Sequence, residues 1–88
     1  MPMPADSQRL LIVEDDAALR AQLKWSFEGI DVAFAENREQ ALAAIRQFEP
    51  QVVLQDLGLP PDAEGATEGF ATLSGILALA PATKVIIV

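Results

Sequence analysis

The feature that constrains the fold most is a short apolar run that ends in acids. Residues 10 to 13 read LLIV, and Glu14, Asp15 and Asp16 follow without a spacer. A continuous apolar run of this length is typical of a strand that is covered on both faces, although the length alone also permits a buried helix. The strand interpretation needs helices on both sides of a sheet, and the rest of the chain contains helical patterns.

Segments with a helical period alternate with strand-like segments. We predict strands at residues 10–13, 30–34, 51–55 and 84–88. We predict helices at 16–28 with Gly29 as the C-cap, from the Asn37 cap to Pro50 with Gln40 completing a capping box, and from about Phe70 to near Pro81. The residues expected to face the core are Leu19, Leu23 and Phe27, then Ala41, Leu42, Ile45 and Phe48, and finally Phe70, Leu73, Ile76, Leu77 and Leu79.

Two helical residues need a separate interpretation. Trp25 lies at the edge of the first apolar stripe, so we expect it to pack in the core or against a helix rather than to stack on a ligand. Asp16 falls at the first helical position, where a carboxylate has an ordinary role in stabilising the helix dipole.

Alternation of strands and helices predicts an α/β fold with a parallel sheet. The carboxyl ends of parallel strands meet at one edge, where ligands bind. Glu14 and Asp15 end the first strand, and Asp56 ends the third within VVLQDLGLPP. If these strands are neighbours, the three carboxylates converge, and their charges raise one another's pKa unless a cation neutralises them.

A group of hard oxygen ligands without His or Cys suits Mg²⁺. A carboxylate beside that metal can attack phosphorus and form an aspartyl phosphate, which would make Asp56 a phosphoryl acceptor. The alternative is a set of solvated loop acids without a chemical role.

Composition limits the possible partners. The 88 residues suffice for one domain, with residues 1–8 as a flexible lead-in, and the net charge is -7 with no Lys/Arg cluster, so we expect no nucleic-acid contact by this chain. Absence of Cys and His excludes disulfides, thiolate ligands and a phosphohistidine on this chain. Neither a spanning segment nor a signal peptide is evident, so we expect no membrane contact and a cytoplasmic location.

The segments LLIVEDD, VVLQDLGLPP and TKVIIV together resemble the receiver domain of two-component response regulators, over essentially the whole chain. The resemblance implies a flavodoxin-like (CheY-like) parallel sheet with flanking helices, incomplete after the fourth strand. It also implies a Mg²⁺-dependent signalling switch rather than an enzyme, with a sensor histidine kinase as its partner.

Site residues carry over from the family position by position. Asp56 matches the phosphorylated Asp, Asp15 the direct metal ligand, and Glu14 an acid that acts through water. Gly58 matches the residue whose carbonyl binds Mg²⁺, and Pro60 the usual loop proline.

A narrower similarity is to response regulators of the PEP-CTERM and exopolysaccharide system. It rests on QLKWSFEG at 22–29 and DLGLPPDAEGATEGFATL at 56–73. Those regulators are transcription activators of the nitrogen-regulator type, so an ATPase domain and a helix-turn-helix domain are expected in a full-length parent.

The chain also departs from the family pattern. Receiver domains carry a hydroxyl residue after the fourth strand and a Lys after the fifth; neither occurs here, and Lys84 begins a strand instead of ending one. We therefore expect phosphorylation of this chain to be absent or strongly impaired. The loop from Pro61 to Glu68 is also about four residues longer than the usual receiver turn if Gly69 is the customary glycine.

Two rival interpretations remain. A phosphotransferase of the haloacid-dehalogenase type would need Asp-x-Asp after the first strand, and EDD does not match. A truncated fragment that acts mainly by self-association, without phosphoryl transfer, is the stronger rival. Its copies would pair through the apolar edge Lys84–Val88 or through an uncovered sheet face, with a symmetric dimer as the default form.

Overall fold

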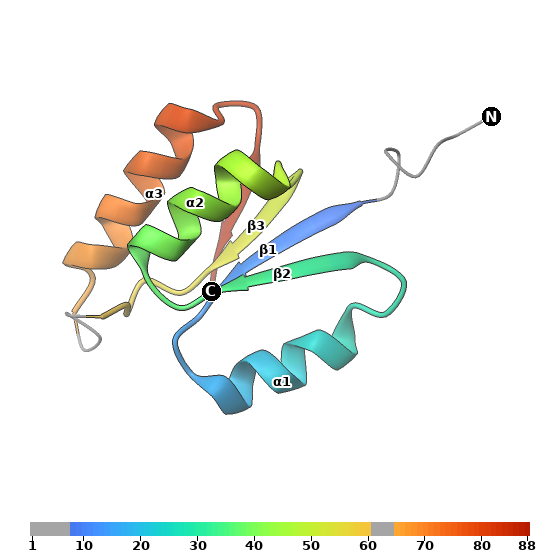
Figure 1. The fold of residues 1–88 in the computed structure, drawn as a ribbon. Helices are drawn as coiled ribbons and strands as arrows, with labels where there is room; N and C mark the ends of the chain where they lie inside the picture. Colours follow the sequence, from blue (N-terminus) through green and yellow to red (C-terminus); the bar gives the residue numbers. More distant parts are fainter. Residues whose placement is uncertain (1–7, 61–64) are drawn as a thin grey trace.

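Strands and helices alternate through the computed structural model, which describes residues 8–60 and 65–88 (Figure 1). The strands in these ranges are β1 (Arg9–Val13), β2 (Asp31–Ala35), β3 (Val52–Gln55) and β4 (Lys84–Ile87). The helices are α1 (Ala17–Ser26), α2 (Arg38–Phe48) and α3 (Thr67–Leu79). This order confirms the predicted elements, with boundaries that differ by one to three residues. The expected lead-in lies outside the described residues except for Gln8.

The strands form one parallel sheet in the order β2-β1-β3-β4. Because β1 pairs with β2 on one side and β3 on the other, its four apolar residues are covered all round, and none is more than 5% exposed. The predicted neighbour relation between the first and third strands is confirmed. Strand order reverses between β1 and β3, which is where ligands bind in sheets of this type.

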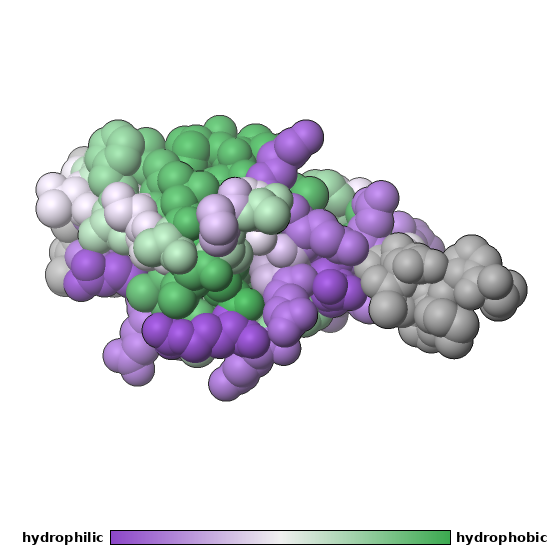
Figure 2. All heavy atoms as spheres, turned by 90° about the horizontal axis from the view of Figure 1, so that it is seen from above, coloured by the Kyte–Doolittle hydropathy of each residue, from purple (hydrophilic) through white to green (hydrophobic). Residues whose placement is uncertain are grey.

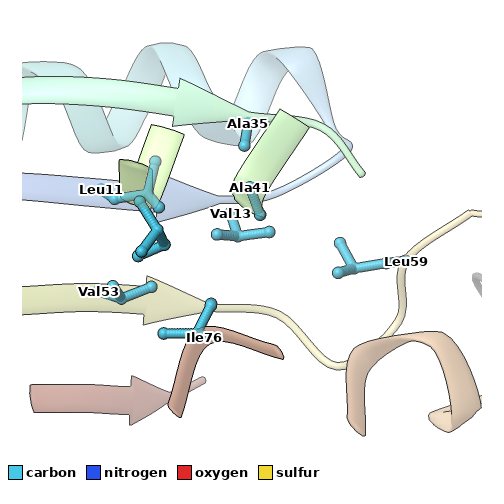
Figure 3. Close-up of a cluster of buried hydrophobic side chains, with 8 residues drawn as sticks. Leu11, Val13, Ala35, Ala41, Val53, Leu59 and Ile76 are labelled. Atoms are coloured by element: carbon cyan, nitrogen blue, oxygen red, sulfur yellow. The ribbon is translucent and has the colours of Figure 1, made fainter. Parts of the chain in front are cut away.

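Helices cover the two faces unequally. In Figure 1, α1 lies on one face of the sheet while α2 and α3 lie together on the other. The main core fills the space between the sheet and the α2–α3 pair (Figure 3). Its buried members are Leu11, Val13, Ala35, Ala41, Ile45, Val53, Leu59 and Ile76.

Side-chain caps stabilise the N-terminal ends of helices α1 and α2. Asp16 is the N-cap of α1, where its carboxylate accepts hydrogen bonds from the amides of Ala18 and Leu19, so its placement inside the helix is wrong by one position. Asn37 caps α2 as predicted, by accepting from the Gln40 amide at 2.9 Å. Gln40 reaches back to the Glu36 amide rather than to the cap residue itself.

The C-terminal end of α1 differs from the prediction. Phe27 is the C-cap, and Gly29 lies two residues further on at a φ of 86°, a conformation that favours glycine. No residue of α1 is fully buried. Trp25 is 80% exposed, so its expected packing role is wrong. Helix α1 has no helical neighbour on its face among the described residues, which leaves the rim of its apolar stripe uncovered.

Helix α3 also packs through an unexpected face. Of the predicted stripe only Ile76 is buried, together with Gly69 and Thr72, whereas Phe70, Leu77 and Leu79 are exposed. The absence of a side chain at Gly69 lets the start of the helix lie against the backbone of Leu57, just after β3. Hydrophobic residues accordingly gather on the surface over the α3 side of the molecule (Figure 2).

Gln55, the last residue of β3, is fully buried beside this contact, which the sequence did not predict. Its Nε2 donates to the Gly69 carbonyl at 2.6 Å. A Cβ at Gly69 would lie 2.1 Å from the Leu57 carbonyl oxygen, so no larger residue fits there without moving the backbone after Asp56. The start of α3 is therefore in close contact with the end of β3 and the backbone that follows it.

This contact predicts that Gly69→Ala destabilises the chain by at least about 2 kcal/mol, because backbone must move to admit the methyl group. Gly75→Ala is the matched control: its added Cβ meets only the flexible end of Leu42, and it gains the same helix propensity. Urea midpoints of the two variants measure the difference. Equal midpoints would contradict the close approach of α3 to residue 57.

Candidate functional site

Three carboxylates converge where β1 and β3 end, as the sequence predicted. Val13 pairs with Gln55 in register, so Glu14 and Asp56 begin the adjacent exits from the sheet. The Asp56 amide donates to the Val13 carbonyl at 2.9 Å, which extends the ladder by one bond. Glu14, Asp15 and Asp56 each offer one carboxylate oxygen, and these oxygens lie within 4.8 Å of one another.

The segment after β1 is fixed by several hydrogen bonds. The Glu14 amide donates to the Ala35 carbonyl of β2 at 2.9 Å, and Glu14 Oε2 accepts from the Asp16 amide at 3.1 Å. Glu14 is only 4% exposed, whereas Asp15 is half-buried and Asp16 points its carboxylate back into the α1 cap. Asp16 therefore belongs to the helix and not to the three-carboxylate cluster.

The segment after β3 holds the third carboxylate. Asp56 Oδ1 accepts from the Gly58 amide at 3.0 Å, and this bond restricts rotation of the carboxylate. Leu59 is fully buried in the main core and anchors the loop that carries Gly58. Gly58 lies beside the acids as predicted; the structure records its amide as a donor, and a metal-binding role for its carbonyl stays a prediction.

The cluster opens into a shallow depression of about 470 Å³ at the carboxyl edge of the sheet. Its lining consists of Glu14, Asp15, Asp16, Leu19, Asp56, Gly58 and Val88. Acids therefore form one side of a solvent-accessible hollow, in which a small charged group can reach them.

Sequence reasoning missed Arg20, which contacts the acidic segment from α1. Its Nη1 donates to the Glu14 carbonyl at 2.8 Å, and its Nη2 lies 3.7 Å from Oε1 of Glu36. The signal in the sequence is a basic residue one turn after the Asp16 cap, where the helix dipole disfavours positive charge. A cation in that position needs a local acceptor, and the Glu14 carbonyl is one.

Burial and like charge act together on Glu14. Desolvation is the main cause that raises its pKa, to about 7, and Asp15 and Asp56 raise it further through hydrogen bonds and, for Asp56, charge repulsion. The hydrogen bond from the Asp16 amide opposes the shift. Without a cation, Glu14 therefore keeps its proton up to a higher pH than an ordinary carboxyl group does.

These residues fit a divalent metal ion with hard ligands. The donors are carboxylate oxygens, with a backbone carbonyl available at Gly58, and Mg²⁺ uses one or two carboxylates together with waters. Burial of Glu14, together with its neighbours Asp15 and Asp56, raises its pKa by disfavouring the charged form, and a bound cation would offset that penalty. Asp15, Asp56 and Gly58 would contact such an ion, and Glu14 would act through water.

A family model described as the response regulator receiver domain matches residues 10–88. The chain belongs to this family. The match covers all four strands and the three carboxylates, so the fold that the sequence resemblance implied is confirmed as the flavodoxin-like receiver fold.

Relatives of this receiver domain come from proteins with different outputs. It is 34% identical over 82 residues to protein-glutamate methylesterase/protein-glutamine glutaminase 3 of Rhodospirillum rubrum, covering 90% of this chain and 21% of that protein. It is 46% identical over 55 residues to the DNA-binding response regulator MtrA of Mycobacterium tuberculosis, covering 60% of this chain and 24% of that protein. The chain thus spans about a fifth to a quarter of these curated relatives.

A solved receiver domain has the same fold. The solution structure of the PhyR receiver domain from Erythrobacter litoralis superposes with a TM-score of 0.76 at 28% identity, covering 97% of this chain and 64% of that one.

The two curated relatives differ in kind, because one is named as a DNA-binding regulator and the other as an enzyme. Within the described part of the receiver domain, no helix is long and apolar enough to cross a membrane.

The protonation of Glu14 predicts an unusual pH dependence of stability. Its pKa is about 7 in the folded chain and 4.5 in the unfolded chain, so the proton stabilises the fold fully below pH 4.5, and that contribution is lost as the pH rises through 7. Urea unfolding in the presence of a chelator should show a loss of up to about 3 kcal/mol over this window from Glu14 alone. Glu14→Gln should remove that part of the slope. An unchanged slope in the variant would contradict the assignment.

Proposed function

We propose that Asp56 accepts a phosphoryl group from a phosphohistidine of a sensor histidine kinase in a Mg²⁺-dependent reaction. The observation that carries the proposal is the convergence of Glu14, Asp15 and Asp56 within 4.8 Å at the switch point between β1 and β3. Membership of the receiver family supports the same role for Asp56. The structure itself holds no phosphoryl group.

In this proposal an Asp56 carboxylate oxygen attacks phosphorus. An O–P bond forms, the N–P bond to the kinase histidine breaks, and the histidine keeps the electron pair. The hydrogen bond from the Gly58 amide restricts rotation of the carboxylate and so helps to orient it for attack. Mg²⁺, when bound, supplies positive charge against the phosphoryl oxygens.

We further propose that the output is transcriptional, in a full-length parent with an ATPase domain and a helix-turn-helix domain. The support is the narrower similarity of residues 22–29 and 56–73 to regulators of the PEP-CTERM type, and a DNA-binding regulator is among the relatives. A methylesterase is also among them, so a different output domain is the competing outcome. A cytoplasmic location stays a prediction.

Phosphorylation can be tested with acetyl phosphate, Mg²⁺ and intact-mass measurement. We expect a small but measurable phosphorylated fraction, because the 88 residues tested do not include the hydroxyl and the lysine that the family places around the phosphoryl group, and such donors are worth several kcal/mol. The fraction should disappear when Mg²⁺ is chelated.

Asp56→Asn is the matched control, because it keeps the shape of the side chain and removes the nucleophilic charge. A phosphorylated species that persists in this variant would show that Asp56 is not the acceptor. Stoichiometric and long-lived phosphorylation of the native chain would show instead that the absent groups are unnecessary.

We also propose that this chain self-associates through β4. The amides of Lys84 and Val88 donate to Gln51 and Gln55 of β3, so in a parallel ladder the backbone groups of Val85 and Ile87 point away from the sheet. Ile86, Ile87 and Val88 are exposed. An apolar strand with an open edge is a template for another strand, and a second copy would supply one in a closed symmetric pair.

Ile87→Pro should abolish association while leaving the fold intact, because proline removes an amide that faces away from β3. Light scattering across a concentration series measures the effect. Trp25→Lys is the control, since it removes an exposed apolar side chain from α1, which lies on one face of the sheet and away from the β4 edge. A native chain that stays monomeric at high concentration, or a Trp25→Lys variant that loses association equally, would refute the β4 interface.

A further inference from the structure

Arg20 lies outside the acidic cluster, and its side chain contacts the backbone within it. Its guanidinium donates to the Glu14 carbonyl at 2.8 Å, and its side chain is only 19% exposed. The second contact, to Glu36 at 3.7 Å, is made to a carboxylate that is more than half exposed. Exposed ion pairs of this length contribute little, so the carbonyl contact is the important one.

The Glu14 peptide groups are thereby fixed on both sides. The amide of Glu14 is bonded to the Ala35 carbonyl, and its carbonyl is bonded to Arg20. The carbonyl of Glu14 and the amide of Asp15 belong to one planar peptide unit. The guanidinium therefore sets the orientation of the plane from which the Asp15 side chain departs.

The same side chain joins three parts of the fold. Arg20 lies on α1, Glu14 follows β1, and Glu36 follows β2. A planar guanidinium with several fixed donors can hold both acceptors at once, whereas a lysine ammonium is a single point of contact. The helix that carries Arg20 is itself tied to the segment after β1 through the Asp16 cap.

We propose that Arg20 is a positioning residue for the metal site, which holds the Glu14–Asp15 peptide so that Asp15 faces Asp56. This inference rests on the proposed function, because it assumes that Asp15 and Asp56 bind Mg²⁺. It does not involve a change in the protonation of the acids. Residues that orient metal ligands typically change metal affinity by one to two orders of magnitude when they are replaced.

The test is an amide NMR titration with Mg²⁺ on four versions of the 88-residue chain: native, Arg20→Met, Arg20→Lys and Glu36→Gln. Met keeps the apolar stem, Lys keeps the charge and one donor, and Gln at position 36 removes the ion pair alone. We expect about tenfold weaker binding for Arg20→Met, partial rescue in Arg20→Lys, and a change within about twofold for Glu36→Gln. If Arg20→Met does not fold, the comparison of Arg20→Lys with Glu36→Gln decides.

Hydrogen exchange in chelator gives a second reading that needs no metal. Arg20→Met should speed exchange at the Asp15 and Asp16 amides while leaving the central strand β3 protected as in the native chain. Native affinity in folded Arg20 variants would overturn this inference alone. A native chain without any Mg²⁺ response would overturn the proposed metal site as well, so the two failures are distinguishable.

Discussion

Parallel pairing of β1 with β3 forces three carboxylates into one corner of the molecule, and the local structure follows from that constraint. Glu14 and Asp56 leave the sheet side by side because Val13 and Gln55 are in register. Repulsion and burial then act on Glu14, whose pKa rises to about 7. The hydrogen bond that Glu14 donates to the Ala35 carbonyl, and those that Arg20 and the Gly58 amide donate, keep the backbone and the carboxylates from relaxing apart.

The sheet and the acidic cluster could be predicted from the sequence because both depend on short, local patterns. Four consecutive apolar residues ended by acids define β1, and the turn of glycine and prolines after Asp56 defines the exit of β3. Periodicity succeeded for α2, where Ala41 and Ile45 are buried as predicted, but it was less reliable for α1 and α3, since exposure depends on which element covers each face. Trp25 has the spacing of a packed residue, yet no described helix lies beside it.

Tertiary contacts account for what the sequence did not reveal. Gln55 is polar and was expected merely to end a strand, but it is buried because Gly69 brings the α3 backbone within 2.6 Å of its amide. Arg20 of α1 was not singled out from the sequence, and its partner is a carbonyl six residues earlier. Such contacts bring together residues from different elements, and the one local signal for them is a basic residue one turn after the Asp16 cap.

Exposed apolar surface on α3 and β4 is the other consequence of this architecture. Helix α3 is apolar on nearly all sides, which is typical of a helix with neighbours all round, yet Phe70 and Leu77 are open to solvent. Gly69 and Thr72 take buried positions instead. Val88, which follows β4, also lines the depression that holds the acids, so the apolar β4 surface adjoins the candidate site, whereas Phe70 and Leu77 lie on α3.

The central claim is that the carboxyl edge of β1 and β3 is a divalent metal site. Substoichiometric Mn²⁺ tests it most directly, because a paramagnetic ion broadens the amide resonances nearest to it. The account predicts selective broadening at residues 14–16 and 56–58, reversed by excess Mg²⁺, with Trp25 unaffected at the far end of α1. Broadening spread over the exposed acids of α2 and the β2 edge, or none at residues 14–16 and 56–58, would contradict it.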